Sequence, residues 1–100
     1  MTRFRLSRQA ESDLKEIADY VADRNPSAAV NELEKLFNKF GLLGRNPLLG
    51  ELRQDLPGKP RSFTAGNFVV LYKPTADGIE VARVVHAARD FGAIFRHKET

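Results

Sequence analysis

The chain has 100 residues, of which 42% are apolar and 29% charged, and its formal net charge is +3 at neutral pH. This composition is typical of one folded domain and argues against intrinsic disorder. Cysteine is absent, which excludes disulfides, thiolate zinc sites and a cysteine nucleophile. The sequence shows neither a secretory signal nor a membrane-spanning stretch, so we expect a single cytoplasmic domain over residues 1–100 with no membrane partner.

The start of the chain predicts a short strand followed by an amphipathic helix. Residues Arg3 to Leu6 alternate basic and apolar side chains, which is the period of a strand. Ser7 then offers its hydroxyl as an N-cap. The acidic residues of the helix lie mostly off its apolar stripe, so we interpret them as a solvated face. That stripe consists of Ala10, Leu14, Ile17, Ala18 and Val21.

A second helix is predicted from Pro26 to Leu43. The pair Asn25-Pro26 interrupts the first helix and suits the cap and first turn of the next. Apolar residues then recur at helical spacing, and Gly44 is expected to end the helix. Two amphipathic helices joined by so short a link should form an antiparallel hairpin.

The second half of the chain predicts a loop and three strands. The stretch up to Pro60 is rich in Pro, Gly and charge and has no sustained period, as expected for a loop. Strands are predicted at 61–65, 68–73 and 79–87, and their short connections require an antiparallel meander. Residues 89–97 are expected to form a short helix or an extended arm.

The predicted element order is therefore β-α-α-β-β-β, which is an α+β fold. The helix hairpin needs an apolar face to cover, and the small antiparallel sheet supplies one. The first strand is free to join that sheet.

No catalytic or cofactor motif is found in the sequence. Its two histidines, His86 and His97, are not part of a metalloprotease, hydrolase or phosphate-binding signature. We interpret His86, near a strand end, as a structural residue, because a general base needs a partner within hydrogen-bond reach. No cofactor or metal site is expected.

The segment RVVHAARDF at residues 83–91 is the most informative cluster. Strand alternation places Arg83 with Val85 on one face and Val84 with His86 on the other.

Two interpretations of this cluster remain open. In the first, Asp90 pairs with Arg89 or Arg61 and fixes the C-terminal segment to the sheet. In the second, four cations form a groove that binds carboxylates or phosphates, namely Arg61, Lys73, Arg83 and Arg89.

Four segments give the chain a resemblance to a known family. They are LSRQAESDLKEIADYVADRNP at 6–26, NPLLG at 46–50, GNFVVLYKP at 66–74 and IEVARVVHAARDF at 79–91. With them the chain resembles the RelE/ParE superfamily of toxins from type II toxin–antitoxin modules, and within it the ParE branch. The resemblance implies a β-α-α-β-β-β fold and a toxin held inactive by a cognate antitoxin.

The resemblance leaves two activities to weigh, because the two branches share a fold. ParE-like toxins are described as inhibitors of DNA gyrase, whereas RelE-like relatives are ribosome-dependent endoribonucleases that cut messenger RNA. The catalytic positions of the nuclease branch fall near Pro60, Ser62, Val69 and Phe95, none of which carries the required group, and Arg89 alone matches. We therefore expect a non-enzymatic toxin, with the ribonuclease as the alternative. A third hypothesis is a regulatory partner without a toxic target.

The partners that the resemblance implies are a ParD-like antitoxin with an acidic C-terminal tail and DNA gyrase as the target. Operator DNA would be contacted only indirectly, through the antitoxin. An acidic tail that folds on binding suits the net charge of +3. Phe91, Ile94 and Phe95 have the spacing of one helical face and should dock on the sheet or on the antitoxin. The candidate antitoxin- or target-contact residues are Arg61, Lys73, Arg83, His86, Arg89, Phe91 and Phe95.

Overall fold

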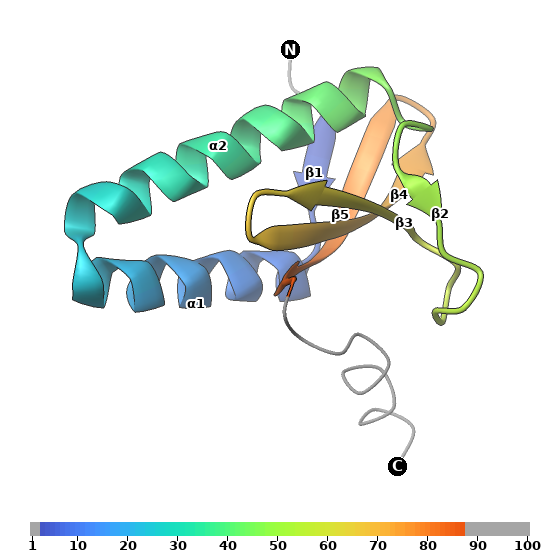
Figure 1. Ribbon diagram of the computed structural model, residues 1–100. Coiled ribbons are helices and arrows are strands. Elements are labelled where there is room, and N and C mark those ends of the chain that lie inside the picture. The colour runs from blue at the N-terminus through green and yellow to red at the C-terminus, as the bar shows by residue number, and fades with distance from the viewer. Residues whose placement is uncertain (1–2, 88–100) are drawn as a thin grey trace.

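Two helices cover one face of a five-stranded sheet in the computed structural model, which describes residues 3–87 (Figure 1). The arrangement confirms the predicted α+β fold and the β-α-α-β-β-β order, with one further short strand after the second helix. The predicted C-terminal helix or arm at 89–97 lies outside the described residues. In chain order the elements are β1 (Phe4–Leu6), α1 (Arg8–Arg24), α2 (Pro26–Arg45), β2 (Glu51–Leu52), β3 (Arg61–Ala65), β4 (Phe68–Thr75) and β5 (Gly78–His86).

Side-chain caps define the helix hairpin. The Ser7 hydroxyl accepts a hydrogen bond from the Ala10 N–H at 3.0 Å and so caps α1 as predicted. Asn25 ends α1 by donating its backbone N–H to the Val21 carbonyl, and it starts α2 by accepting from the N–H groups of Ser27 and Ala28. One residue therefore serves both helices, which explains how the connection can be so short.

The C-terminal end of α2 differs from the prediction. The helix continues through Gly44 to Arg45, and Asn46 is its C-cap, with its N–H near the Leu42 and Leu43 carbonyls. A Cβ at position 44 would lie 2.7 Å from the backbone oxygen of Arg3. Gly44 is thus present because α2 packs closely against the chain entering β1, and not because the helix ends there.

The sheet has the order β1-β5-β4-β3-β2. Strands β3, β4 and β5 form the predicted antiparallel meander, whereas β1 pairs in parallel with β5, so the complete sheet is mixed. The short strand β2 pairs with β3 in a region where the sequence predicts only a loop. A bulge at Ala82 separates the pair Tyr72–Val81 from the pair Leu71–Arg83.

The main core lies between the helices and the sheet. Strand alternation beyond the bulge follows the prediction, because Val84 belongs to this core and Val85 to a smaller cluster with Leu56 on the opposite face. No helix among residues 3–87 is long and apolar enough to cross a membrane. The buried residues of the main core are Ala10, Leu14, Leu36, Phe40, Leu43, Ala65, Phe68, Val70, Tyr72, Ile79, Val81 and Val84.

Candidate partner-binding site

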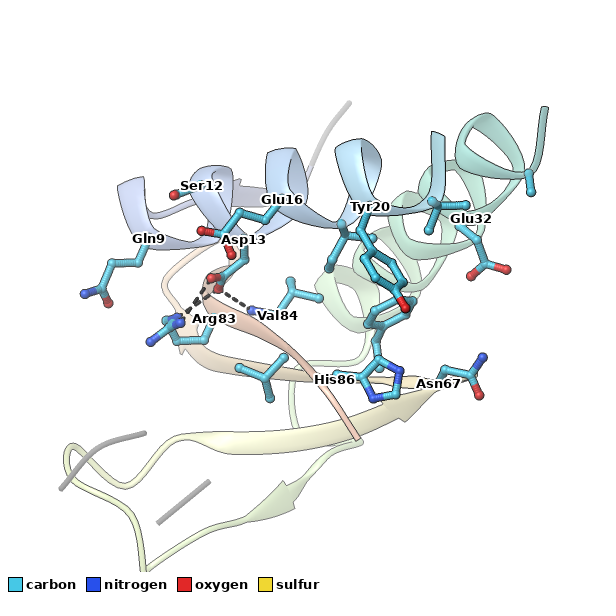
Figure 2. A pocket seen from close by; sticks show the side chains of 15 residues that line it. Gln9, Ser12, Asp13, Glu16, Tyr20, Glu32, Asn67, Arg83, Val84 and His86 are labelled. Atoms are coloured by element: carbon cyan, nitrogen blue, oxygen red, sulfur yellow. Dashed lines mark hydrogen bonds and ion pairs between the residues drawn. The ribbon is translucent and has the colours of Figure 1, made fainter. Parts of the chain in front are cut away.

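A groove of about 960 Å³ opens between the helix hairpin and the end of β5. Its apolar lining includes Ile17 from α1, Ala28 from α2 and Val84 from β5. Glu16 and Glu32 add carboxylates, so the groove combines an apolar surface with negative charge. Figure 2 shows Asp13 and Arg83 toward one end of this site and Tyr20, Glu32, Asn67 and His86 toward the other.

The first of these ends is formed by an ion pair between α1 and β5. Arg83 donates from Nε to Oδ2 of Asp13 at 2.8 Å and from Nη2 to Oδ1 at 3.0 Å. The same Oδ2 accepts the backbone N–H of Val84 at 2.9 Å (Figure 2). The hydrogen bond to Asp13 raises the pKa of Arg83 above its ordinary value despite the opposing effect of burial, so the guanidinium stays charged.

Asp13 also completes the edge of the sheet. Strand β1 pairs with β5 only as far as Val81, and Ser7 then donates its N–H to the Val81 carbonyl and its hydroxyl to the Ala82 carbonyl. Further along this edge of β5, the backbone N–H of Val84 donates to the carboxylate of Asp13. The first turns of α1 therefore satisfy backbone groups of β5 that have no strand beside them.

His86 lies at the other end of the groove, as the last residue of β5. Its side chain is exposed, and its ring meets Phe68 edge-on with the ring centroids 5.5 Å apart. Tyr20 projects from α1 with 59% of its surface exposed. The guanidinium of Arg24 lies over its ring, with Cζ 4.6 Å from the ring centroid. These two exposed rings give the groove amphipathic contact surface of the kind that is enriched at protein interfaces.

Arg61 and Tyr72 act together at a different place, on the loop after α2. Arg61 donates from Nη1 to the Gly50 carbonyl at 2.7 Å. The Tyr72 hydroxyl accepts the Gly50 N–H at 2.8 Å and donates to the Pro47 carbonyl at 2.9 Å. Burial raises the pKa of Tyr72 above its ordinary value, although the Gly50 N–H opposes this, so the phenol remains a neutral donor.

The described residues of the predicted cationic groove make separate contacts, and its fourth member, Arg89, lies outside the described residues, so the groove stays a prediction. Arg61 is hydrogen-bonded to the loop after α2 and Arg83 is bound to Asp13 of α1, so the two guanidinium groups are engaged at separate places. Lys73 is exposed on β4, where it is paired in register with Glu80 and its Nζ passes close to Gly58. Both arginines are half-buried and find oxygen acceptors within their own chain, which residue spacing alone cannot reveal.

Several predicted site residues lie outside the described residues. Arg89, Phe91 and Phe95 belong to this group, as does Asp90 of the predicted ion pair, so their contact roles stay predictions. Within residues 3–87 the structure contains no cluster of three or more His, Asp or Glu side chains able to hold a metal ion.

Sequence reasoning missed the role of Asp13, which it placed on the solvated face of α1. A signal was present, because Asp13 lies three residues after Ala10 and four before Ile17, on the margin of the apolar stripe. A carboxylate at that margin can reach across to a neighbouring strand. Its partner could not be identified, since Arg83 is 70 positions away in the chain.

Three comparisons with known proteins agree. A family model described as "ParE toxin of type II toxin-antitoxin system, parDE" matches residues 4–91. "Toxin ParE1" of Mycobacterium tuberculosis, found in the CDC 1551 / Oshkosh strain and in the ATCC 25618 / H37Rv strain, is 31% identical over 91 residues, which cover 89% of this chain and 93% of the relative.

A solved structure supports the fold independently. The chain resembles one from the "Chromosomal ParDE TA system from P. aeruginosa" with a TM-score of 0.68 and 23% identity, covering 86% of this chain and 96% of that one. The two chains thus share a fold.

Proposed function

This chain belongs to the ParE toxin family of type II toxin–antitoxin systems, and from that membership we propose that it arrests growth by binding and inhibiting DNA gyrase. In this proposal the protein acts in the cytoplasm, uses no cofactor and breaks no covalent bond itself. A cognate ParD-like antitoxin neutralises it, and operator DNA is reached only through that antitoxin.

The observation that best supports a non-enzymatic function is that two arginines of the sheet are hydrogen-bonded within the chain. Cleavage of RNA requires a cation at the phosphate together with a proton donor and acceptor. Arg61 is bound to a loop carbonyl and Arg83 to a carboxylate, so both serve the fold. Val69 lies in β4 near a position where the nuclease branch carries a catalytic group, and it is 6% exposed and belongs to the smaller apolar cluster.

The groove supports the antitoxin part of the proposal. Its apolar surface around Ile17 and Val84 fits apolar side chains of a segment that folds on binding. Because Glu16 and Glu32 line it, the part of the antitoxin that enters the groove should be apolar or basic. The acidic residues of the antitoxin should lie outside the groove, where the excess positive charge of the chain can attract them.

A supercoiling assay tests the gyrase proposal. Purified protein added to gyrase and relaxed plasmid should block supercoiling or trap cleaved DNA, and added antitoxin should restore the reaction. A protein that arrests growth in cells but leaves supercoiling unchanged at matched concentration would refute gyrase as the target.

A ribosome-dependent ribonuclease remains the second candidate, and one observation favours it. His86 is exposed at the end of β5, three residues before Arg89 in the chain, so the two could act on one phosphate. This candidate predicts new cuts in ribosome-bound messages soon after induction. His86→Ala and Arg89→Ala should then abolish both the cuts and the growth arrest, whereas intact messages during arrest would exclude it.

A further inference from the structure

The segment between α2 and β3, which contains the short strand β2, exposes three leucines to solvent. Leu48, Leu49 and Leu52 are 69%, 52% and 44% exposed. They lie within seven consecutive residues, 46–52, which we call the leucine knuckle. Single exposed leucines are common on protein surfaces, whereas several in one short segment are typical of an interaction surface.

The backbone of the leucine knuckle is held in place. Asn46 fixes its start, because its side-chain Nδ2 donates to the Leu42 carbonyl at 3.0 Å and its carbonyl accepts the Leu49 N–H at 3.0 Å. Tyr72, which is fully buried, bridges Pro47 and Gly50 through its hydroxyl. These bonds fix the backbone of the turn in the conformation that leaves its leucine side chains exposed.

Arg61 completes the support of the leucine knuckle and adds charge beside it. Its Nη1 donates to the Gly50 carbonyl at 2.7 Å and lies 3.4 Å from the Leu48 carbonyl. Arg45, exposed at the end of α2, is a second cation next to the loop, while Glu51 is the one acid within the knuckle. The apolar tip is therefore flanked by a net positive charge.

The leucine knuckle is separate from the groove. Ala28 and Glu32 of the groove lie in the first turns of α2, whereas the knuckle follows the last turn of this 20-residue helix. A helix of that length spans about 30 Å. In Figure 1 the loop lies at the end of α2 opposite to the α1–α2 connection. A segment bound in the groove would thus leave the knuckle uncovered.

We propose that the leucine knuckle is the surface through which the toxin binds the protein that it inhibits. Leu48 and Leu49 would enter an apolar pocket on that protein, and an acidic rim of the pocket would face Arg45 and Arg61. Leucine side chains make no favourable contact with phosphate groups. The exposed leucines together with the positive charge therefore fit the surface of a protein better than a nucleic acid. This inference rests on the proposed function, in which the toxin acts by binding.

The test uses the double variant Leu48→Ser, Leu49→Ser in the full-length chain. Both side chains are exposed, so the thermal unfolding midpoint should stay close to that of the wild type. Growth arrest on induction and gyrase inhibition in vitro should weaken by about tenfold or more, whereas affinity for the antitoxin should not change. The matched control is Val30→Ser, because Val30 is 57% exposed on α2 and does not line the groove.

Three results would overturn the inference. Wild-type potency of the double variant would show that no target contact is made here. An equal loss of antitoxin affinity would assign the leucine knuckle to the antitoxin interface, and a change of oligomeric state alone would assign it to a second copy of the chain. If the wild type arrests growth without inhibiting gyrase, the gyrase proposal fails, but the growth-arrest comparison still tests the knuckle.

Discussion

Asp13 and Arg83, which lie 70 positions apart in the chain, are joined by two hydrogen bonds that connect α1 to β5. The side chains are 11% and 17% exposed, so water screens their interaction only weakly. Asp13 also binds the Val84 N–H, which makes one carboxylate responsible for a charge pair and for a sheet-edge hydrogen bond. This contact adds to the apolar packing that holds α1 over the end of β5, and it lies at one end of the groove.

Removing the carboxylate should destabilise the fold. Asp13→Ala leaves the Arg83 guanidinium and the Val84 N–H without their acceptor, and the free energy of unfolding should fall by about 2 to 3 kcal/mol. Urea denaturation measures the change. Asp19→Ala on the same helix is the control, because Asp19 is exposed, and it should change stability by less than about 0.5 kcal/mol. Equal losses for the two variants would contradict this account of Asp13.

Two glycine substitutions should have opposite effects. Gly50→Ala places a Cβ 2.6 Å from the Tyr72 hydroxyl and 2.8 Å from the Ser62 carbonyl, so backbone must shift, at a cost of about 1 to 3 kcal/mol. Gly41→Ala meets only the end of Arg45 at 3.5 Å, and alanine should stabilise the helix by about 0.5 to 1 kcal/mol. Thermal unfolding of both variants checks the pair. A tolerated Gly50→Ala would mean that the loop is not held closely against Tyr72.

Stability should decrease at alkaline pH because of Tyr72. Burial raises its folded-state pKa above the ordinary value of 10.0, so the unfolded phenol loses its proton first and the folded state binds more protons. The stability that Tyr72 contributes in this way is fully present below pH 10 and is lost as the pH rises through the folded-state pKa. Denaturation at several pH values should show the decrease in the wild type and a smaller one in Tyr72→Phe. Identical pH profiles for the two proteins would exclude this role for Tyr72.

Local sequence patterns predicted most of the fold. The caps at Ser7 and Asn25, the hairpin and the three-stranded meander all depend on neighbouring residues, and the structure confirms them. The parallel pairing of β1 with β5 and the passage of Gly44 against Arg3 depend on residues far apart in the chain. Periodicity carries no information about such contacts, which is why β2 was missed, the end of α2 was misplaced and the partner of the first strand was left open.

The candidate site was less predictable than the fold. Arg61, Arg83 and His86 were selected from the sequence by residue type, but the two arginines turn out to bind oxygens of their own chain. The groove itself is made by residues of four elements whose proximity arises only from the packing of the hairpin on the sheet. A residue's chemistry can be read from sequence, whereas its availability to a partner depends on these tertiary contacts.

Tyr20 offers a direct test of the groove as the antitoxin site. Its ring lines the groove and is 59% exposed, so Tyr20→Ala should leave the unfolding free energy within about 1 kcal/mol of the wild type, the loss of the Arg24 contact included. Affinity for the cognate antitoxin should fall by about tenfold, because an aromatic anchor is removed from the interface. Calorimetric titration measures this affinity, with Val30→Ala as a control of similar exposure outside the groove. If both variants bind the antitoxin as the wild type does, the groove is not its binding site.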